Sequence, residues 1–139
     1  MKILLDTNVV SEARRPDGNP SVRAMLSATA NEDQFISVIS LGEIAYGIAR
    51  LKSGKRRRDL EDWVAQLERD FSDHLLPVDR HISHLWGDLA ARCDKTGRPI
   101  SAPDGLIAAT AIHHGLRLIT RNTTDFEATG VMLIDPWQA

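Results

Sequence analysis

Lys2-Ile-Leu-Leu-Asp-Thr-Asn8 begins as a short apolar run and ends abruptly at an acid. A run this short and this apolar is typical of a strand that is buried on both faces of a sheet. Four more apolar runs of similar length follow, at residues 35–38, 75–78, 116–120 and 131–134. The sequence therefore predicts five buried strands.

The segments between these strands show the apolar spacing of helices. We expect helices at residues 21–30, 40–51, 55–71, 80–95 and 101–114. Residues 15–20, which are rich in turn formers, and residues 121–130 are expected to form turns and loops. Strands that alternate with helices indicate an α/β fold, in which a parallel sheet is covered on both faces.

Composition favours one folded domain over residues 1–139. The 42% of hydrophobic and 26% of charged residues argue against disorder. No apolar run is long enough to span a bilayer and no secretory signal is recognisable, so we expect a cytoplasmic protein without membrane contact. The single cysteine, Cys93, fits the same compartment. A net charge of −2 disfavours indiscriminate wrapping of nucleic acid but allows a local site whose phosphates meet a metal ion.

Residues that follow the strands are the first candidates for chemistry, because ligands of parallel α/β sheets bind at the carboxyl ends of the strands. Asp6 follows the first strand and suits a metal ligand or a general base. Its structural alternative is a turn in which Asp6 caps the next segment. The residues after the other strands include Ser40, Asp79 and the pair Arg121-Asn122.

Two acids on predicted helices also have a structural and a functional interpretation. Asp104 is the third residue of a helix capped by Ser101, where an acid stabilises the helix start. Gly105 beside it costs about 1 kcal/mol relative to Ala in a helix, which suggests close approach of a ligand or another backbone. Glu43 lies with Tyr46 opposite the stripe Leu41, Ile44, Ala45 and Ile48, as either a solvated residue or a pocket acid.

Together the acids indicate a divalent-cation site. Asp6, Glu43 and Asp104 converge in a doubly wound fold, and carboxylate oxygens are hard ligands suited to Mg²⁺ or Mn²⁺. Such a site can hydrolyse a phosphodiester with a metal-activated water, while Glu43 orients that water or accepts its proton. We expect products with a 5′-phosphate and a 3′-hydroxyl.

Four segments resemble the PIN-domain nucleases: residues 3–9, 40–48, 102–109 and 119–126. Their order and spacing are similar to those of the VapC and FitB toxins of bacterial toxin–antitoxin pairs. The resemblance implies a three-layer α/β/α fold with a central, mainly parallel five-stranded sheet. It also implies a homodimer, Mg²⁺ in an acidic pocket, RNA as substrate, and a cognate small DNA-binding antitoxin as partner.

Residue by residue, the resemblance assigns catalytic roles to Asp6, Glu43 and Asp104, and metal ligation to Asp6 and Asp104. Asn122 stands at the family's fourth acidic position, where related toxins carry either Asp or Asn, and Asp125 is the nearest acidic substitute. We expect the pocket to be supported by Asn8, Asn122 and Asp125.

Contacts to RNA or to an antitoxin are expected from Arg14, Arg15, Tyr46 and Arg121. The basic run from Arg50 to Arg58 has two interpretations. It is either a rim that grips phosphates or a helix start that pairs with the acids of its own helix.

Two other functions remain open from the residues. Asn122 fits a catalytically impaired PIN-like binding module. A Mg²⁺-dependent phosphotransfer domain shares the acid after the first strand, but it needs a lysine after the fourth, and the lysines here are residues 2, 52, 55 and 95.

Overall fold

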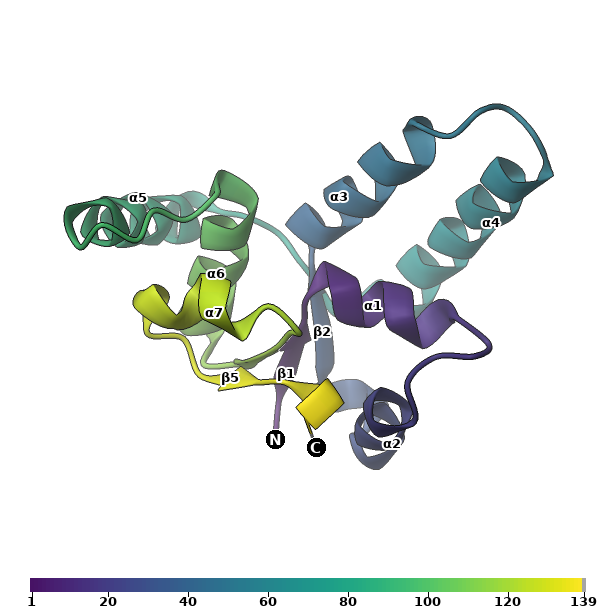
Figure 1. Ribbon diagram of the computed structural model, residues 1–139, viewed down its shortest axis with the longest axis horizontal. Coiled ribbons are helices and arrows are strands. Elements are labelled where there is room, and N and C mark those ends of the chain that lie inside the picture. The colour runs from purple at the N-terminus through teal and green to yellow at the C-terminus, as the bar shows by residue number, and fades with distance from the viewer. Residues whose placement is uncertain (139) are drawn as a thin grey trace.

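A computed structural model describes residues 1–138 and shows a five-stranded parallel sheet between two layers of helices (Figure 1). The sheet has the order β3-β2-β1-β4-β5, and every pairing is parallel. Its strands are β1 (Ile3–Leu5), β2 (Gln34–Ser37), β3 (Leu75–Leu76), β4 (Arg117–Ile119) and β5 (Leu133–Ile134). The predicted α/β/α fold with a parallel sheet is confirmed.

Seven α-helices connect these strands within the described residues. They are α1 (Thr7–Arg14), α2 (Pro20–Ala28), α3 (Val38–Ala49), α4 (Lys55–Asp70), α5 (Arg80–Lys95), α6 (Ala102–His114) and α7 (Thr123–Phe126). Single 3₁₀ turns occur at Asn31–Asp33, Glu127–Thr129 and Pro136–Gln138. None of the helices described between residues 1 and 138 combines the length and apolarity needed to cross a bilayer.

The two faces of the sheet carry separate apolar cores, because successive residues of a strand point to opposite faces. Leu4 packs with residues of α5 and α6, including Leu89 and Ile107. Ile3 and Leu5 pack on the other face with side chains from α1 to α4. Figure 1 shows the same division, with α5 to α7 on one side of β1 and α1 to α4 on the other.

Helix α1 begins directly after β1, where the structural alternative for Asp6 was a turn. Asp6 is its N-cap, and the adjacent Val9 and Val10 are both buried. β-Branched neighbours favour strands over helices, so packing against the sheet rather than local preference stabilises this helix. The loop expected at residues 121–130 is likewise helical, since α7 and a 3₁₀ turn fill it.

Helix α3 begins earlier than predicted. It starts at Val38, directly after β2, because the Ser37 hydroxyl accepts a hydrogen bond of 3.0 Å from the Ile39 N–H. Ser40 therefore lies inside the helix and is buried, on one face with Ile44 and Ile48. The expected stripe was right for these two isoleucines and wrong for Ala45, which is exposed.

Gly105 is explained by a side chain and not by a ligand or a backbone. A Cβ built on Gly105 would lie 2.7 Å from Cδ1 of Trp86. Since real Cβ atoms do not approach so closely, any larger residue would displace the indole. The glycine thus lets α5 and α6 pack closely, and the expectation of a ligand or backbone at this position was wrong.

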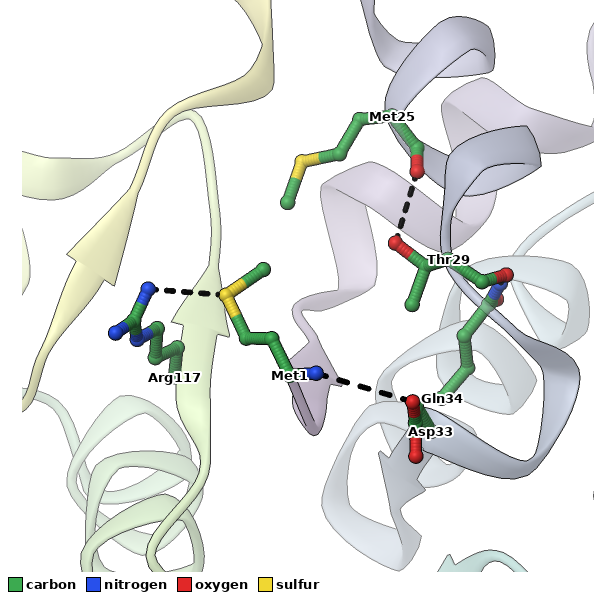
Figure 2. A network of polar contacts seen from close by, with 6 residues as sticks. All are labelled: Met1, Met25, Thr29, Asp33, Gln34 and Arg117. Atoms are coloured by element: carbon green, nitrogen blue, oxygen red, sulfur yellow. Dashed lines mark hydrogen bonds and ion pairs between the residues drawn. The ribbon is translucent and has the colours of Figure 1, made fainter.

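Polar contacts join the amino-terminal ends of the central strands (Figure 2). The main-chain nitrogen of Met1 lies 3.8 Å from the Asp33 carboxylate, and Arg117 Nη1 lies 3.0 Å from the Met1 sulfur. The Gln34 side-chain amide donates to the Thr29 carbonyl at 3.1 Å. These contacts lie at the edge opposite the carboxyl ends of the strands, where the candidate residues gather.

Candidate active site

The neighbouring strands β1 and β4 bring Asp6 and Thr120 together. The main-chain N–H of Asp6 donates to the Ile119 carbonyl at 2.9 Å, which extends the ladder by one bond. The Thr120 hydroxyl then donates to Asp6 Oδ2 at 2.7 Å, while Asp6 Oδ1 accepts the N–H of Thr7 at 2.8 Å. Only 4% of Asp6 is exposed. Both of its carboxylate oxygens are therefore held in place before any ligand binds.

Glu43 comes from α3 and is tied to the same segment. The Thr7 hydroxyl donates to Glu43 Oε1 at 2.6 Å, across 36 residues of sequence. Glu43 is partly buried. It is therefore not the fully solvated surface residue that was one of its two interpretations. The dipeptide Asp6-Thr7 thus supplies one carboxylate, and its threonine hydroxyl positions the carboxylate of Glu43.

Asp104 occupies the first turn of α6, and its N–H donates to the capping Ser101 hydroxyl at 3.3 Å. Its carboxyl has a pKa raised to about 6, mainly by burial and also by the negative charges of Asp6, Glu43 and Asp125, while the hydrogen bond with Ser101 lowers the pKa. Asp104 therefore lies at the capped start of its own helix, as its structural interpretation predicted, and also within the charge field of the other acids.

The Asp6 carboxyl feels the same surroundings. Burial raises its pKa, the hydrogen bonds from Thr120 and Thr7 lower it, and the charges of Glu43 and Asp125 raise it again. The charged groups that act on Asp6 and Asp104 are all acids. The candidate site is thus a region of concentrated negative charge.

The donor set of this site fits a hard divalent cation, which prefers carboxylate oxygens and relieves their repulsion. Within residues 1–138, however, no three Asp, Glu, His or Cys side chains already stand together as a metal site. Asp6 and Asp104 are the side chains that would hold such an ion, with Glu43 joined to Asp6 through Thr7.

The predicted supporting residues lie around Asp6. The Asn8 amide nitrogen is 3.4 Å from Asp6 Oδ2 and 3.4 Å from the Thr120 hydroxyl. Asn122 uses its main-chain N–H, which donates to the Thr120 hydroxyl at 3.0 Å. Asp125 lies in α7, and its negative charge raises the pKa of Asp6.

The predicted contact residues are dispersed. Arg14 lies over the Trp63 ring at the far end of α1, and Arg15 pairs with Glu12 and Asp17. Arg121 donates its N–H to the Asn8 side chain, but its guanidinium lies 5.1 Å from the centre of the Trp137 ring. Tyr46 lines a hollow together with Glu43. Of the four, Tyr46 is therefore the side chain placed beside a predicted catalytic acid.

Part of the basic run pairs with the acids of its own helix, as one interpretation predicted. The Lys55 ammonium lies 2.7 Å from the Asp59 carboxylate, and Arg57 lies 3.7 Å from Glu61. Both pairs connect positions four residues apart on α4, a favourable spacing on an exposed helix.

Two site residues escaped the sequence analysis: Thr7 and Thr120. Each is a hydroxyl within two positions after a buried apolar strand. That position is the available signal, since the carboxyl end of the strand is where polar side chains converge.

Comparison with known proteins identifies the family. Residues 3–131 match the PIN domain family. The chain is 36% identical over 137 residues to the VapC ribonuclease Y4jK of Sinorhizobium fredii, which covers 98% of each chain. It is 38% identical over 136 residues to the toxin FitB of Neisseria gonorrhoeae, which covers 97% of this chain and 98% of FitB. A solved structure of FitAB bound to an IR36 DNA fragment superposes with a TM-score of 0.90 at 37% identity, covering 97% of this chain and 95% of that one. The chain therefore belongs to the PIN-domain family, and within it to the VapC and FitB type that its four motifs indicated.

Proposed function

We propose that this protein is a Mg²⁺-dependent endoribonuclease that acts as the toxic component of a toxin–antitoxin pair. One observation carries the proposal: at the carboxyl edge of the sheet Thr7 hydrogen-bonds both Asp6 and Glu43, and the charges of Glu43 and Asp125 raise the pKa of both Asp6 and Asp104. Acids that raise one another's pKa destabilise a fold, and a cation site for phosphodiester chemistry gives that arrangement a use. The names of the relatives, a ribonuclease and a toxin, support the same activity.

Asp6 and Asp104 are the residues suited to hold the ion, and Mn²⁺ is the expected substitute for Mg²⁺. When bound, the ion supplies a more acidic water and polarises a phosphoryl oxygen. Asp6 is pre-oriented by Thr7 and Thr120, so its oxygens need no reorganisation. Asp104 has a pKa of about 6, so it is largely ionised at neutral pH and ready to bind a cation.

Glu43 is suited to act on the water that attacks the phosphate. Thr7 occupies one of its oxygens, and the other is available to orient the attacking water and accept its proton. Attack by water on phosphorus leaves a 5′-phosphate and a 3′-hydroxyl, and it does not use the 2′-hydroxyl of the RNA. A 2′,3′-cyclic phosphate product would contradict this chemistry.

The decisive test maps 5′-phosphate ends in total cellular RNA after incubation with the purified protein, with and without Mg²⁺. Asp104→Asn is the inactive variant, and Asp88→Asn, an exposed acid of α5, is the matched control. We expect discrete Mg²⁺-dependent ends with the wild type and the control, and none with Asp104→Asn. New ends from Asp104→Asn would remove this residue from the mechanism. Absence of ends from every folded variant would favour the binding-module alternative, for which Asn122 is the motivating residue.

The proposed partners follow from the same family. We propose a cognate DNA-binding antitoxin, a homodimeric toxin and a cytoplasmic location, where RNA and the antitoxin are both present. The superposable FitAB complex was solved on DNA, which supports a DNA-binding partner of this kind. Measuring the molar mass of the purified protein, alone and after co-expression with a candidate DNA-binding antitoxin, tests the dimer and the partner.

A further inference from the structure

Four of the five histidines of the chain lie on two helices that pack against each other, α5 and α6 (Figure 1). His81 and His84 are near the start of α5, and His113 and His114 are the last two residues of α6. Because His81 contacts His113, the start of α5 lies next to the end of α6. The fold thus gathers histidines that are far apart in the sequence.

The imidazole rings of His81 and His113 lie parallel at this helix contact. Their centres are 6.1 Å apart, and their planes differ by 6°. A zinc–nitrogen bond measures about 2.0–2.1 Å, so the ring centres of two imidazoles on one ion are at most about 6.5 Å apart. The observed separation lies within that limit. Binding one ion therefore requires rotation of two exposed side chains and no movement of either helix.

The surroundings of the two rings leave them available to a cation. His114 packs edge-on against His113, with ring centres 4.9 Å apart. Asp79, the N-cap of α5, is close enough that the charges of His81 and His113 lower its pKa, and its carboxylate favours a cation nearby. The fifth histidine, His74, already has its Nδ1 2.9 Å from a main-chain carbonyl. Within residues 1–138, the rings of His81 and His113 have no such hydrogen-bond partner.

These rings are separate from the candidate active site in position and in chemistry. His113 follows Asp104 by nine residues on α6, which is about 14 Å along the helix axis. Imidazole nitrogens suit Zn²⁺, Ni²⁺ and Cu²⁺, whereas carboxylate oxygens suit Mg²⁺. No three Asp, Glu, His or Cys side chains of the described chain are already arranged around an ion, so water completes the coordination of an ion held by two imidazoles.

We infer that His81 and His113 bind a divalent transition-metal ion of the Zn²⁺ class, which joins the start of α5 to the end of α6. The two ligands come from different helices and meet only when the chain is folded, so the ion binds the folded state in preference to the unfolded state. Zn²⁺ therefore stabilises the protein against unfolding, and it does so without entering the chemistry at the carboxylates.

Calorimetric titration with Zn²⁺ tests the site in the full-length protein at about pH 7.5, with excess Mg²⁺ to occupy the carboxylates. We expect one Zn²⁺ ion per chain. His81→Ala and His113→Ala should each weaken binding by at least about tenfold, because each leaves a single imidazole on the ion. His84→Ala removes another exposed histidine of α5 and should bind as the wild type does. Binding should be lost at about pH 5, where protonated imidazoles cannot be ligands.

Thermal unfolding gives a second readout, and the midpoint of each variant in EDTA shows that it folds. Zn²⁺ should raise the midpoint of the wild type and of His84→Ala, and leave those of His81→Ala and His113→Ala unchanged. A folded wild type that binds no Zn²⁺ would overturn the inference. Zn²⁺ binding that Asp104→Asn removes and His113→Ala spares would place the ion at the carboxylates and overturn it too. A Zn²⁺-dependent rise in molar mass would show that the ion joins two copies of the chain, against a site within one.

Discussion

Replacing Asp104 by Asn should stabilise the metal-free protein at neutral pH. The ionised Asp104 carboxylate lies half-buried among the charges of Asp6, Glu43 and Asp125, and these surroundings raise its pKa from 3.8 to about 6. Asparagine has almost the same shape and no charge. The main-chain bond from residue 104 to the Ser101 hydroxyl remains in the variant.

The magnitude follows from the pKa. A rise from 3.8 to about 6 corresponds to about 3 kcal/mol of difference between the two protonation states. The carboxyl is only half-buried, so solvent and salt reduce this to about 1–2 kcal/mol. The sign follows because the folded state binds the proton more tightly than the unfolded state does. The wild type therefore loses this stability as the pH rises from about 4 to about 6, and the full cost is present above pH 6.

Urea unfolding in EDTA at pH 4.0 and at pH 7.5 measures the effect, with Asp88→Asn as the control for removing an exposed acid. We expect Asp104→Asn to be about 1–2 kcal/mol more stable than the wild type at pH 7.5, with most of the gain absent at pH 4.0. Adding Mg²⁺ should stabilise the wild type and reduce or reverse the difference, because the ion binds only the folded carboxylate cluster. A variant that is less stable than the wild type at pH 7.5 would refute the account of this site as mutually repelling acids.

Three further changes test separate contacts. Thr120→Val removes the hydroxyl that donates to buried Asp6, so it should cost about 1–3 kcal/mol in urea unfolding and raise the Asp6 pKa in an NMR titration; an unchanged pKa would contradict this bond. Gly105→Ala should lower the free energy of unfolding by about 1–2 kcal/mol in the same assay, because the new Cβ would lie 2.7 Å from the Trp86 indole. Gly87→Ala, in open space on α5, should raise the free energy of unfolding by about 0.5–1 kcal/mol. Equal effects of the two glycine substitutions would exclude close packing as the reason for the first. Asn122→Asp adds an acid next to the cluster and should tighten Mg²⁺ binding measured by calorimetry; weaker binding would place residue 122 outside the cation site.

The main outline of the fold was predictable from the sequence because its strands are continuous apolar runs and its helices carry caps. Asp79 accepts the Ile82 N–H at 2.9 Å and Gly115 ends α6 with a φ of 66°, as their residue types suggest. The gathering of Asp6, Glu43 and Asp104 was also predictable, since parallel strands place their carboxyl ends at one edge.

Other features depend on residues far away in the sequence, and local pattern cannot show them. Helix α1 needs the sheet beneath Val9 and Val10, whose own preference is for strands. The roles of the Thr7 and Thr120 hydroxyls depend on hydrogen-bond partners that lie 36 and 114 residues away in the sequence. The sequence suggested that Gly105 leaves room for a ligand, whereas the structure shows that it leaves room for the indole of Trp86.

The position of β4 in the sheet has a consequence for the synthesis of the protein. β4 inserts between β1 and β5, and Thr120 reaches back across 114 residues to fix Asp6. Asp6 and Glu43 therefore leave the ribosome long before β4, the strand that completes their surroundings, has been synthesised. Because contacts so distant in sequence form late, the candidate site assembles only when nearly the whole chain has been translated. Fragments released early by a stalled ribosome or a premature stop codon lack that edge, and so they should be harmless to the cell that makes them.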